Sequence, residues 1–251
     1  MDVHVPHQPL HTWKDFWIHL GTITVGLLIA IGLEQSVEKL HHLHQRHQLE
    51  EDLHAEAEKN LKIMDDDYTN LDANMMWLSA YRDDVDTMRA SGGKIKLPYR
   101  RFYPPQGLFV TIPSSSAWTA ASESELTALL PREEVKMYDR VYFELKSYDD
   151  SYERKVEDTR KELIFEARFA HVTLGPYRPD LSLMSKGDLD QLSAILGENM
   201  VVSRQARNRL DILYEAEKSV AVGSTTEDEV LAAIEKRLLA NRPKPPAAPA
   251  Q

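Results

Sequence analysis

The chain contains no cysteine, and this absence excludes several classes of site at once. Without thiols there are no disulfides, no thiolate-bound zinc or iron–sulfur centre, and no cysteine nucleophile. The motifs that mark phosphate-binding loops, serine hydrolases and zinc peptidases are also missing. From the sequence we therefore expect a protein that is not an enzyme and that carries no cofactor.

Positive charge is scarce, because 30 Lys and Arg stand against 40 Asp and Glu, for a formal net charge of −10. An acidic chain repels phosphate backbones, so nucleic acid is not an expected partner. Proline and glycine are absent between Glu34 and Ser91, and alternation at period two is not sustained anywhere. Both features favour helices over strands.

One long apolar run is present near the N-terminus, from Phe16 to Leu33, and it has no formal charge. Its eighteen residues span roughly 27 Å as a helix, close to the thickness of a bilayer's hydrocarbon core. Trp13 and Trp17 stand at one end, where an interfacial aromatic belt would lie. The run predicts a transmembrane helix over residues 16–33, preceded by a short segment, 1–15. A cleaved signal peptide and a buried soluble helix remain alternatives.

Small residues recur every four positions in this run, at Thr22, Gly26 and Ala30. Such spacing lets two membrane helices approach closely, so it predicts helix packing and a possible homodimer. The orientation is weakly encoded. Lys14 precedes the run, and Lys39 and Arg46 follow it, so the count of flanking cations differs by one residue and leans toward a cytoplasmic C-terminal side.

The remaining chain reads as helices. Apolar residues at three- and four-residue spacing predict helices over 34–90, 116–130, 131–171, 185–223 and 226–239. The first of these is one helix, or two with a bend near residues 65–67. The expected fold class is all-α: one transmembrane helix, then an antiparallel bundle of three long and two short helices over 34–240. Residues 241–251, rich in Pro and Ala, are expected to be disordered. Within this pattern Val156 and Leu163 are expected in the core, and Asp65 to Asp67 on a solvated face or at the start of a helix.

Four segments give the chain a resemblance to known sequences. They read HLGTITVGLLIAIGLEQ (19–35), LEEDLHAEAEKNL (49–61), SAWTAASESELTALLPREEV (116–135) and VKMYDRVYFEL (135–145). With these segments the chain resembles a family of bacterial single-span membrane proteins whose helical domain has no assigned function. The resemblance implies an anchor in the inner (cytoplasmic) membrane and an extracytoplasmic domain, against the one-residue charge difference, and it transfers no catalytic residues.

Nine of the ten histidines lie in the first 54 residues. His41, His44 and His47 step by three along the expected helix, and Glu51 follows four residues later. Imidazoles and a carboxylate at such spacing can bind zinc, copper or nickel, and imidazole also titrates near neutral pH. Steps of three turn each group by about 60° from the last, so a solvated helix face is the alternative reading.

An irregular segment, LPYRRFYPPQGLF (97–109), joins two of the expected helices. Arg100 and Arg101 beside Phe102 and Tyr103 form a candidate interaction site for an anionic headgroup, a glycan or a protein. The alternative is that the aromatic side chains cap the end of the bundle.

Together these features predict a membrane-anchored helical domain that contacts the lipid bilayer and binds an unknown envelope protein or ligand. The alternative is a membrane-proximal metal or pH sensor that uses the histidine cluster 41–47.

Overall fold

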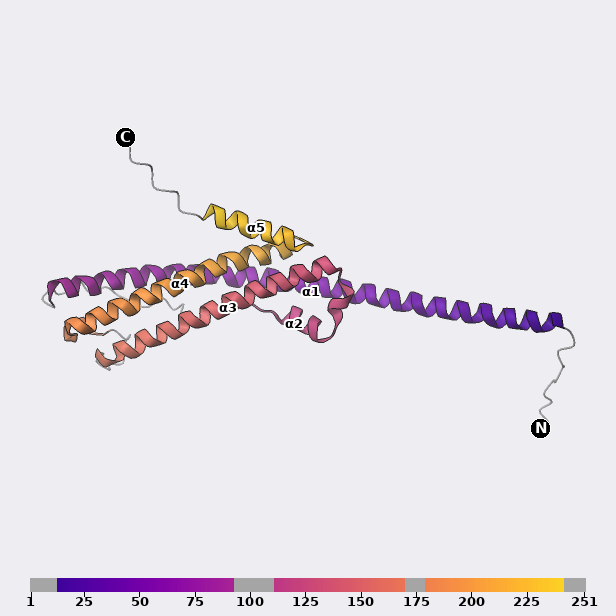
Figure 1. The fold of residues 1–251 in the computed structure, drawn as a ribbon, viewed down its shortest axis with the longest axis horizontal. Helices are drawn as coiled ribbons and strands as arrows, with labels where there is room; N and C mark the ends of the chain where they lie inside the picture. The colour runs from indigo at the N-terminus through magenta and orange to yellow at the C-terminus, as the bar shows by residue number, and fades with distance from the viewer. Residues whose placement is uncertain (1–12, 93–110, 170–178, 242–251) are drawn as a thin grey trace, which may run out of the picture. The chain divides into compact units, whose positions relative to one another are not determined.

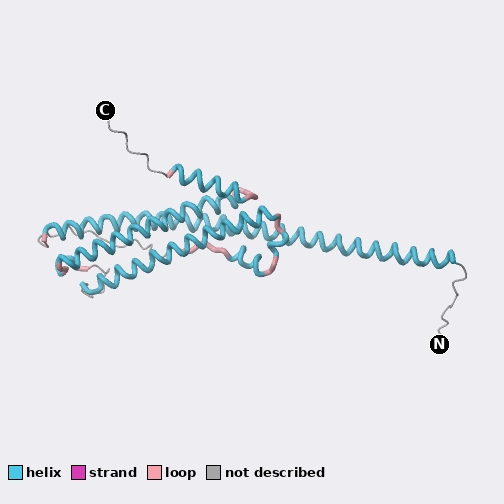
Figure 2. The backbone as a smooth tube through the Cα atoms, in the orientation of Figure 1, coloured by secondary structure: helices cyan, strands magenta, loops and turns pink. Residues whose placement is uncertain are grey.

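The computed structural model describes residues 13–92, 111–169 and 179–241, and among these residues it contains helices and connecting turns but no strand (Figure 2). The α-helices are α1 (Trp13–Ser91), α2 (Ser116–Glu123), α3 (Arg132–Glu166), α4 (Lys186–Ala221) and α5 (Glu227–Ala240). Single turns of 3-10 helix lie at Leu126–Leu129, Ala167–Phe169 and Leu181–Leu183. The predicted all-α class, with three long and two short helices, is confirmed for the described residues.

The chain divides into two compact units, residues 1–49 and 50–251, and α1 contributes to both. In the first unit the described residues belong to α1 alone, and their apolar side chains are exposed, as at Ile23 (68 %) and Leu28 (63 %). One stretch of α1 is long and apolar enough to cross a membrane. The second unit contains the helical bundle.

Local sequence signals set the helix ends. Ser185 accepts a hydrogen bond from the amide of Asp188, and the Asp188 carboxylate accepts one from the amide of Ser185, so α4 opens with a full capping box. At α5, Thr226 accepts from the amide of Glu229, but the Glu229 carboxylate accepts from the amide of Thr225 instead of Thr226. The second hydrogen bond of a capping box is therefore displaced by one residue at α5.

Two predicted helices are shorter in the structure. The helix expected over 116–130 ends at Glu123, because Glu125 adopts a left-handed conformation (φ 60°) that breaks the ladder before a 3-10 turn. The helix expected over 131–171 begins at Arg132, with Pro131 at its N-cap, and its α-helical part ends at Glu166. His171 lies outside the described residues.

The second part of α1, α3 and α4 run side by side in the bundle, and α5 lies against α4 (Figure 1). The directions follow from the contacts. Asn60 pairs with Glu217 and Arg89 with Asp190, so α1 and α4 are antiparallel. Helix α3 is parallel to α1. The chain leaves α1 at Ser91 and returns along the bundle, so that Ser114 is hydrogen-bonded to Asn60, and α3 then runs in the same direction as α1. The antiparallel arrangement therefore centres on α4.

The buried face of α1 follows a seven-residue repeat made of two series. One series is apolar and fully buried, and it contains Ala57, Met64, Leu71, Leu78 and Val85. The other series is also buried but changes character in its middle; it contains Leu53, Asn60, Asp67, Asn74, Tyr81 and Met88. Two positions per heptad form the seam by which helices pack. The bundle therefore has polar side chains at its centre.

The polar interior corrects two predictions made from the sequence. Val156 and Leu163 were expected in the core, yet they are 45 % and 41 % exposed, while their neighbours Lys155 and Glu162 are buried at 0 % and 2 %. Asp67 was expected on a solvated face, yet it is 1 % exposed. These predictions were wrong because the buried face of each helix was assigned from its apolar residues alone.

Candidate functional site

The polar interior of the bundle is a group of buried ionisable and amide side chains. All three long helices contribute to it. Its buried ionisable members are Asp67 and Asp84 on α1; Glu144, Lys155, Glu162 and Glu166 on α3; and Asp211 and Glu217 on α4. Burying a charge is costly unless it is paired or neutralised, so each group needs a physical account.

Asp67 and Tyr148 join α1 to α3 near the middle of the bundle. The Tyr148 hydroxyl donates a hydrogen bond of 3.1 Å to the Asp67 carboxyl. Burial raises the pKa of Asp67 to about 7, although the bond from Tyr148 works in the opposite direction. Burial and the nearby Asp67 raise the pKa of Tyr148 as well, so the hydroxyl stays protonated and remains the donor.

Nearer the end of α3, Lys155, Glu162 and Glu166 share the interior with Asn199 of α4. The Asn199 side chain donates to the Glu162 carboxyl. Burial raises the pKa of Glu162 to about 8, the neighbouring Glu166 adds to this, and Asn199 and Lys155 oppose it. Burial also raises the pKa of Glu166 to about 7, opposed by a hydrogen bond from Tyr81.

Lys155 is fully buried, and its Nζ finds no hydrogen-bond acceptor within the described part of the chain. The Nζ lies 5.6 Å from the centroid of the Tyr152 ring. Burial lowers the pKa of Lys155, and the charge of Glu162 opposes the shift. The interior therefore contains acids whose pKa is raised and an amine whose pKa is lowered, and both shifts favour the neutral form.

A second polar cluster fixes the start of α2 to α1. Asn60 donates to the Ser114 carbonyl at 2.8 Å and accepts from the Ser114 amide at 2.8 Å. The Glu56 carboxylate accepts from the hydroxyls of Ser114 (2.6 Å) and Ser116 (2.8 Å) and from the Ala117 amide. Glu56 thus supplies from another helix the cap that Ser115, at the N-cap of α2, does not.

Asn60 also donates to Glu217 of α4 at 2.8 Å, and burial raises the pKa of Glu217 to about 7. A cavity of about 30 Å³ opens beside this cluster, lined by Glu56, Glu217, Trp118 and Tyr138 among others. That volume is enough for a water molecule and too small for an organic ligand. We interpret this cluster as structural.

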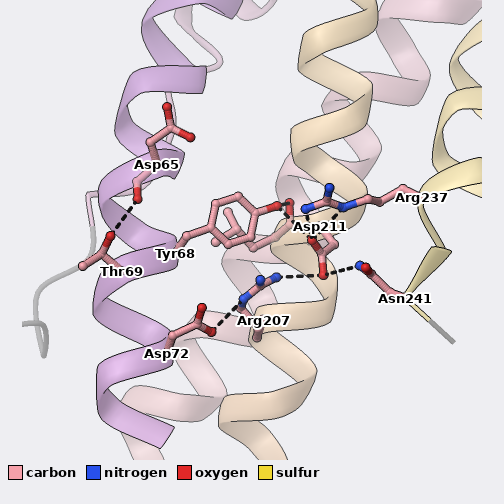
Figure 3. A network of polar contacts seen from close by, with 9 residues as sticks. Asp65, Tyr68, Thr69, Asp72, Arg207, Asp211, Arg237 and Asn241 are labelled. Carbon is pink, nitrogen blue, oxygen red and sulfur yellow. Dashed lines mark hydrogen bonds and ion pairs between the residues drawn. The ribbon is translucent and has the colours of Figure 1, made fainter. Parts of the chain in front are cut away.

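A third cluster surrounds Asp211 of α4 (Figure 3). Its Oδ1 accepts from Arg237 of α5 (Nη2, 3.0 Å) and from the Tyr68 hydroxyl (3.1 Å). Its Oδ2 forms an ion pair with Arg207 (2.7 Å) and accepts from Asn241 (3.2 Å). The cluster joins α1, α4 and α5 through one carboxylate, and Arg207 also lies 4.1 Å from the centroid of the Tyr68 ring.

The residues predicted as sites from the sequence lie elsewhere. His41, His44 and His47 are exposed on α1, and no three His, Asp or Glu side chains among the described residues, these and Glu51 included, are arranged to hold a metal. Metal binding by this cluster stays a prediction. Thr22, Gly26 and Ala30 are exposed on α1, and a Cβ added at Gly26 would meet no atom within 4 Å. Arg100, Arg101, Phe102 and Tyr103 lie outside the described residues.

Sequence reasoning missed the interior acids, Lys155 and the Asp211 cluster. One signal was present in the chain: α4 carries Arg204, Arg207 and Arg209 within six residues, a local excess of cations in an acidic protein. The seven-residue spacing of Asn60, Asp67 and Asn74 was a second signal.

Comparison of the chain with protein-family models, with curated proteins and with solved structures finds no match. Over the residues that the structure describes, the fold is all-α, and α1 is long and apolar enough to cross a membrane.

Proposed function

We propose that this protein is a single-span membrane protein whose helical domain binds a protein or ligand at the cell envelope. The observation that carries the proposal is the contrast between the two units. The apolar stretch of α1 has none of its residues buried, whereas the domain over residues 50–241 buries a core of its own. A large exposed apolar surface in a soluble protein is strongly unfavourable, and lipid is the partner that matches its length and composition.

Hydrogen bonding within the stretch supports the same proposal. The Thr22 hydroxyl donates to the carbonyl of Ile18 (2.9 Å), and the Thr24 hydroxyl donates to that of Leu20 (2.8 Å). Polar groups in a hydrocarbon layer have to be satisfied within the protein, and both hydroxyls meet that condition without a partner chain.

The compartment is proposed from the sequence resemblance: an anchor in the inner membrane with residues 34–251 on the extracytoplasmic side. Binding is favoured over catalysis because Asp67, Glu162 and Glu166 are buried between helices. The two interior acids that line a cavity or groove, Glu217 and Asp211, are already hydrogen-bonded to other side chains. A homodimer through Thr22, Gly26 and Ala30 remains part of the proposal.

The test uses the absence of cysteine. The variant Ser91→Cys introduces a single thiol at the end of α1. Intact and lysed cells are treated with a membrane-impermeant maleimide, and membranes are washed at alkaline pH. Retention in the washed membranes with labelling of intact cells supports the proposal. Release of the protein by the wash would contradict the membrane anchor. Labelling only after lysis would place the domain in the cytoplasm.

A second candidate function is a response to pH, favoured by the burial of Asp67, Glu162, Glu166 and Glu217 inside the bundle. In this form the proton-binding groups are the interior acids and not the histidines 41–47. Protonation of these acids removes buried charge, so acidification would increase the stability of the bundle. The pH series described in the Discussion tests this candidate.

A further inference from the structure

A groove of about 660 Å³ lies among α3, α4 and α5. Its wall includes Ser151 and Arg154 of α3, Gln205, Asn208 and Arg209 of α4, and Leu238 of α5. The volume falls within the range of small-molecule sites, and the three helices belong to one compact unit. The groove is therefore large enough and well enough supported to hold an organic ligand.

Among the described residues the groove wall contains one acid, Asp211, and its carboxylate is already fully engaged. Asp211 uses Oδ1 for Arg237 and Tyr68 and Oδ2 for Arg207 and Asn241. A carboxylate surrounded by four donors neither repels an anion strongly nor offers a free acceptor to a ligand. The groove consequently presents to a ligand the other groups of its wall.

These other groups are mainly hydrogen-bond donors. Arg154 donates to the uncharged Ser151 hydroxyl (3.1 Å) and forms no ion pair with an acid among the described residues. Arg209 lies 3.9 Å from Glu144, which is also paired with Arg140, so two guanidinium groups share one carboxylate. A guanidinium group binds oxyanions through paired, directional hydrogen bonds.

The remaining wall suits a hydroxylated molecule. The side-chain amides of Gln205 and Asn208 are exposed and make no hydrogen bond to any other described residue, so they can both donate and accept. Ile212 and Leu238 add an apolar surface on which the carbon face of a ring can pack. Arginine, amide and aliphatic side chains can contact the charged group, the hydroxyls and the carbon face of an acidic sugar, respectively.

We propose that the groove among α3, α4 and α5 binds a small hydroxylated oxyanion, a phosphorylated or carboxylated sugar, through Arg154 and Arg209. The inference rests on the proposed function in one respect, that the domain acts by binding. An oxyanion site is unexpected in a chain with a net charge of −10. It is explained by the two arginines of the groove wall, which make the charge positive there although the average charge of the surface is negative.

The test is calorimetric titration of the full chain in non-ionic detergent with glucose 6-phosphate, glucuronate and glucose. The salt is set to about 0.15 M, where exposed charges are screened beyond about 8 Å. At least one of the two acids is expected to bind, and glucose at least tenfold more weakly. The acid that binds identifies whether the oxyanion is a phosphate or a carboxylate.

The variants locate the site. Arg154→Gln and Arg209→Gln are each expected to weaken binding about tenfold, the loss of one charge-assisted contact. Arg204→Gln, an exposed α4 arginine outside the groove wall, is the matched control and is expected to change affinity less than twofold. Asn208→Trp fills the groove without changing charge and is expected to abolish binding. All four positions are exposed, so the helical content and melting temperature verify that the variants fold.

Two results would overturn the proposal: neither acid binds, or Arg204→Gln weakens binding as much as the groove variants do. The second result would mean diffuse attraction to the surface of α4. Failure here is separable from failure of the proposed function, because calorimetry reports the groove whichever side of the membrane the domain occupies. Labelling of Ser91→Cys reports the side of the membrane whether or not the groove binds.

Discussion

The hydroxyl of Tyr148 in α3 donates a hydrogen bond of 3.1 Å to the carboxyl of Asp67 in α1, and both side chains are buried. The bond joins the two parallel helices of the bundle at a point where neither group can reach bulk water. A buried carboxyl with one identified side-chain donor is sensitive to the loss of that donor.

Tyr148→Phe is therefore expected to destabilise the domain by about 1–3 kcal/mol, because the buried Asp67 carboxyl loses this hydrogen bond and keeps only the one from the Thr111 backbone. The effect should be larger at about pH 8 than at about pH 6, because the pKa of Asp67, about 7, would rise further without the donor. Chemical denaturation of the full chain in detergent measures both values. Tyr142→Phe, at a 37 % exposed position of the same helix, is the control. An equal loss in both variants would contradict the role of the Asp67 bond.

The stability of the domain is expected to increase as the pH falls from about 8 to about 5. The pKa of Glu162 is raised from 4.5 to about 8 in the folded protein, so between these values the folded state binds a proton that the unfolded state lacks. Its contribution is complete below the unfolded pKa and is lost as the pH rises through the folded one. Each such group changes stability by at most about 1.4 kcal/mol per pH unit.

The comparison that isolates this effect is Glu162→Gln, which keeps the shape and removes the titration. Melting temperatures across the pH range should show a shallower slope for the variant. Lys155, whose pKa is lowered, acts in the opposite direction, because its folded form gives up a proton as the pH rises. A parent protein whose stability instead rises steadily from about pH 5 to about pH 8 would rule out neutral acids in the interior and the pH-response function with them.

Lys155→Met is expected to stabilise the domain at about pH 6 by about 1–3 kcal/mol. The substitution replaces a buried amine that lacks a hydrogen-bond acceptor among the described residues with an apolar chain of similar length. At this pH Glu162, with a pKa of about 8, is protonated and does not need the amine's charge. Lys146→Met serves as the control, because Lys146 is 64 % exposed and its substitution should change stability by less than about 0.5 kcal/mol. A clear destabilisation by Lys155→Met would show that the amine is charged and paired.

Glu56→Ala is expected to loosen the start of α2 without unfolding the bundle. Glu56 accepts hydrogen bonds from the hydroxyls of Ser114 and Ser116 and from the Ala117 amide, and all of them are lost together. Hydrogen exchange should accelerate at the amide of Ala117 and across α2, while α3 and α4 keep their protection. Glu58→Ala, at an exposed position about half a turn along α1 from Glu56, should leave exchange in α2 unchanged. Equal protection in Glu56→Ala and the parent would show that Glu56 does not hold this segment.

The sequence predicted the helices well because helical periodicity and end signals are local. Ser185 and Asp188 mark the start of α4 in the chain and form its capping box in the structure. The interior was predicted poorly because it depends on tertiary partners. Nothing in the local sequence distinguishes the buried Lys155 and Glu162 from the exposed charged residues beside them. The apolar Val156 and Leu163 therefore led to the wrong prediction of the buried face. The groove depends on the docking of α5, which no single segment encodes.

The two buried series of α1 respond differently to a shift in the register of α1 against the other helices of the bundle. If α1 slipped by one heptad, about 10 Å, Met64, Leu71, Leu78 and Val85 would still meet apolar neighbours, so these residues barely distinguish the two registers. The polar series does distinguish them. The same slip would move Asp67 to the place of Asn60, against Glu217, and set two buried carboxyls face to face where an amide and an acid now pair. A single aligned state of the bundle is thus specified by the residues that contribute least to its hydrophobic core.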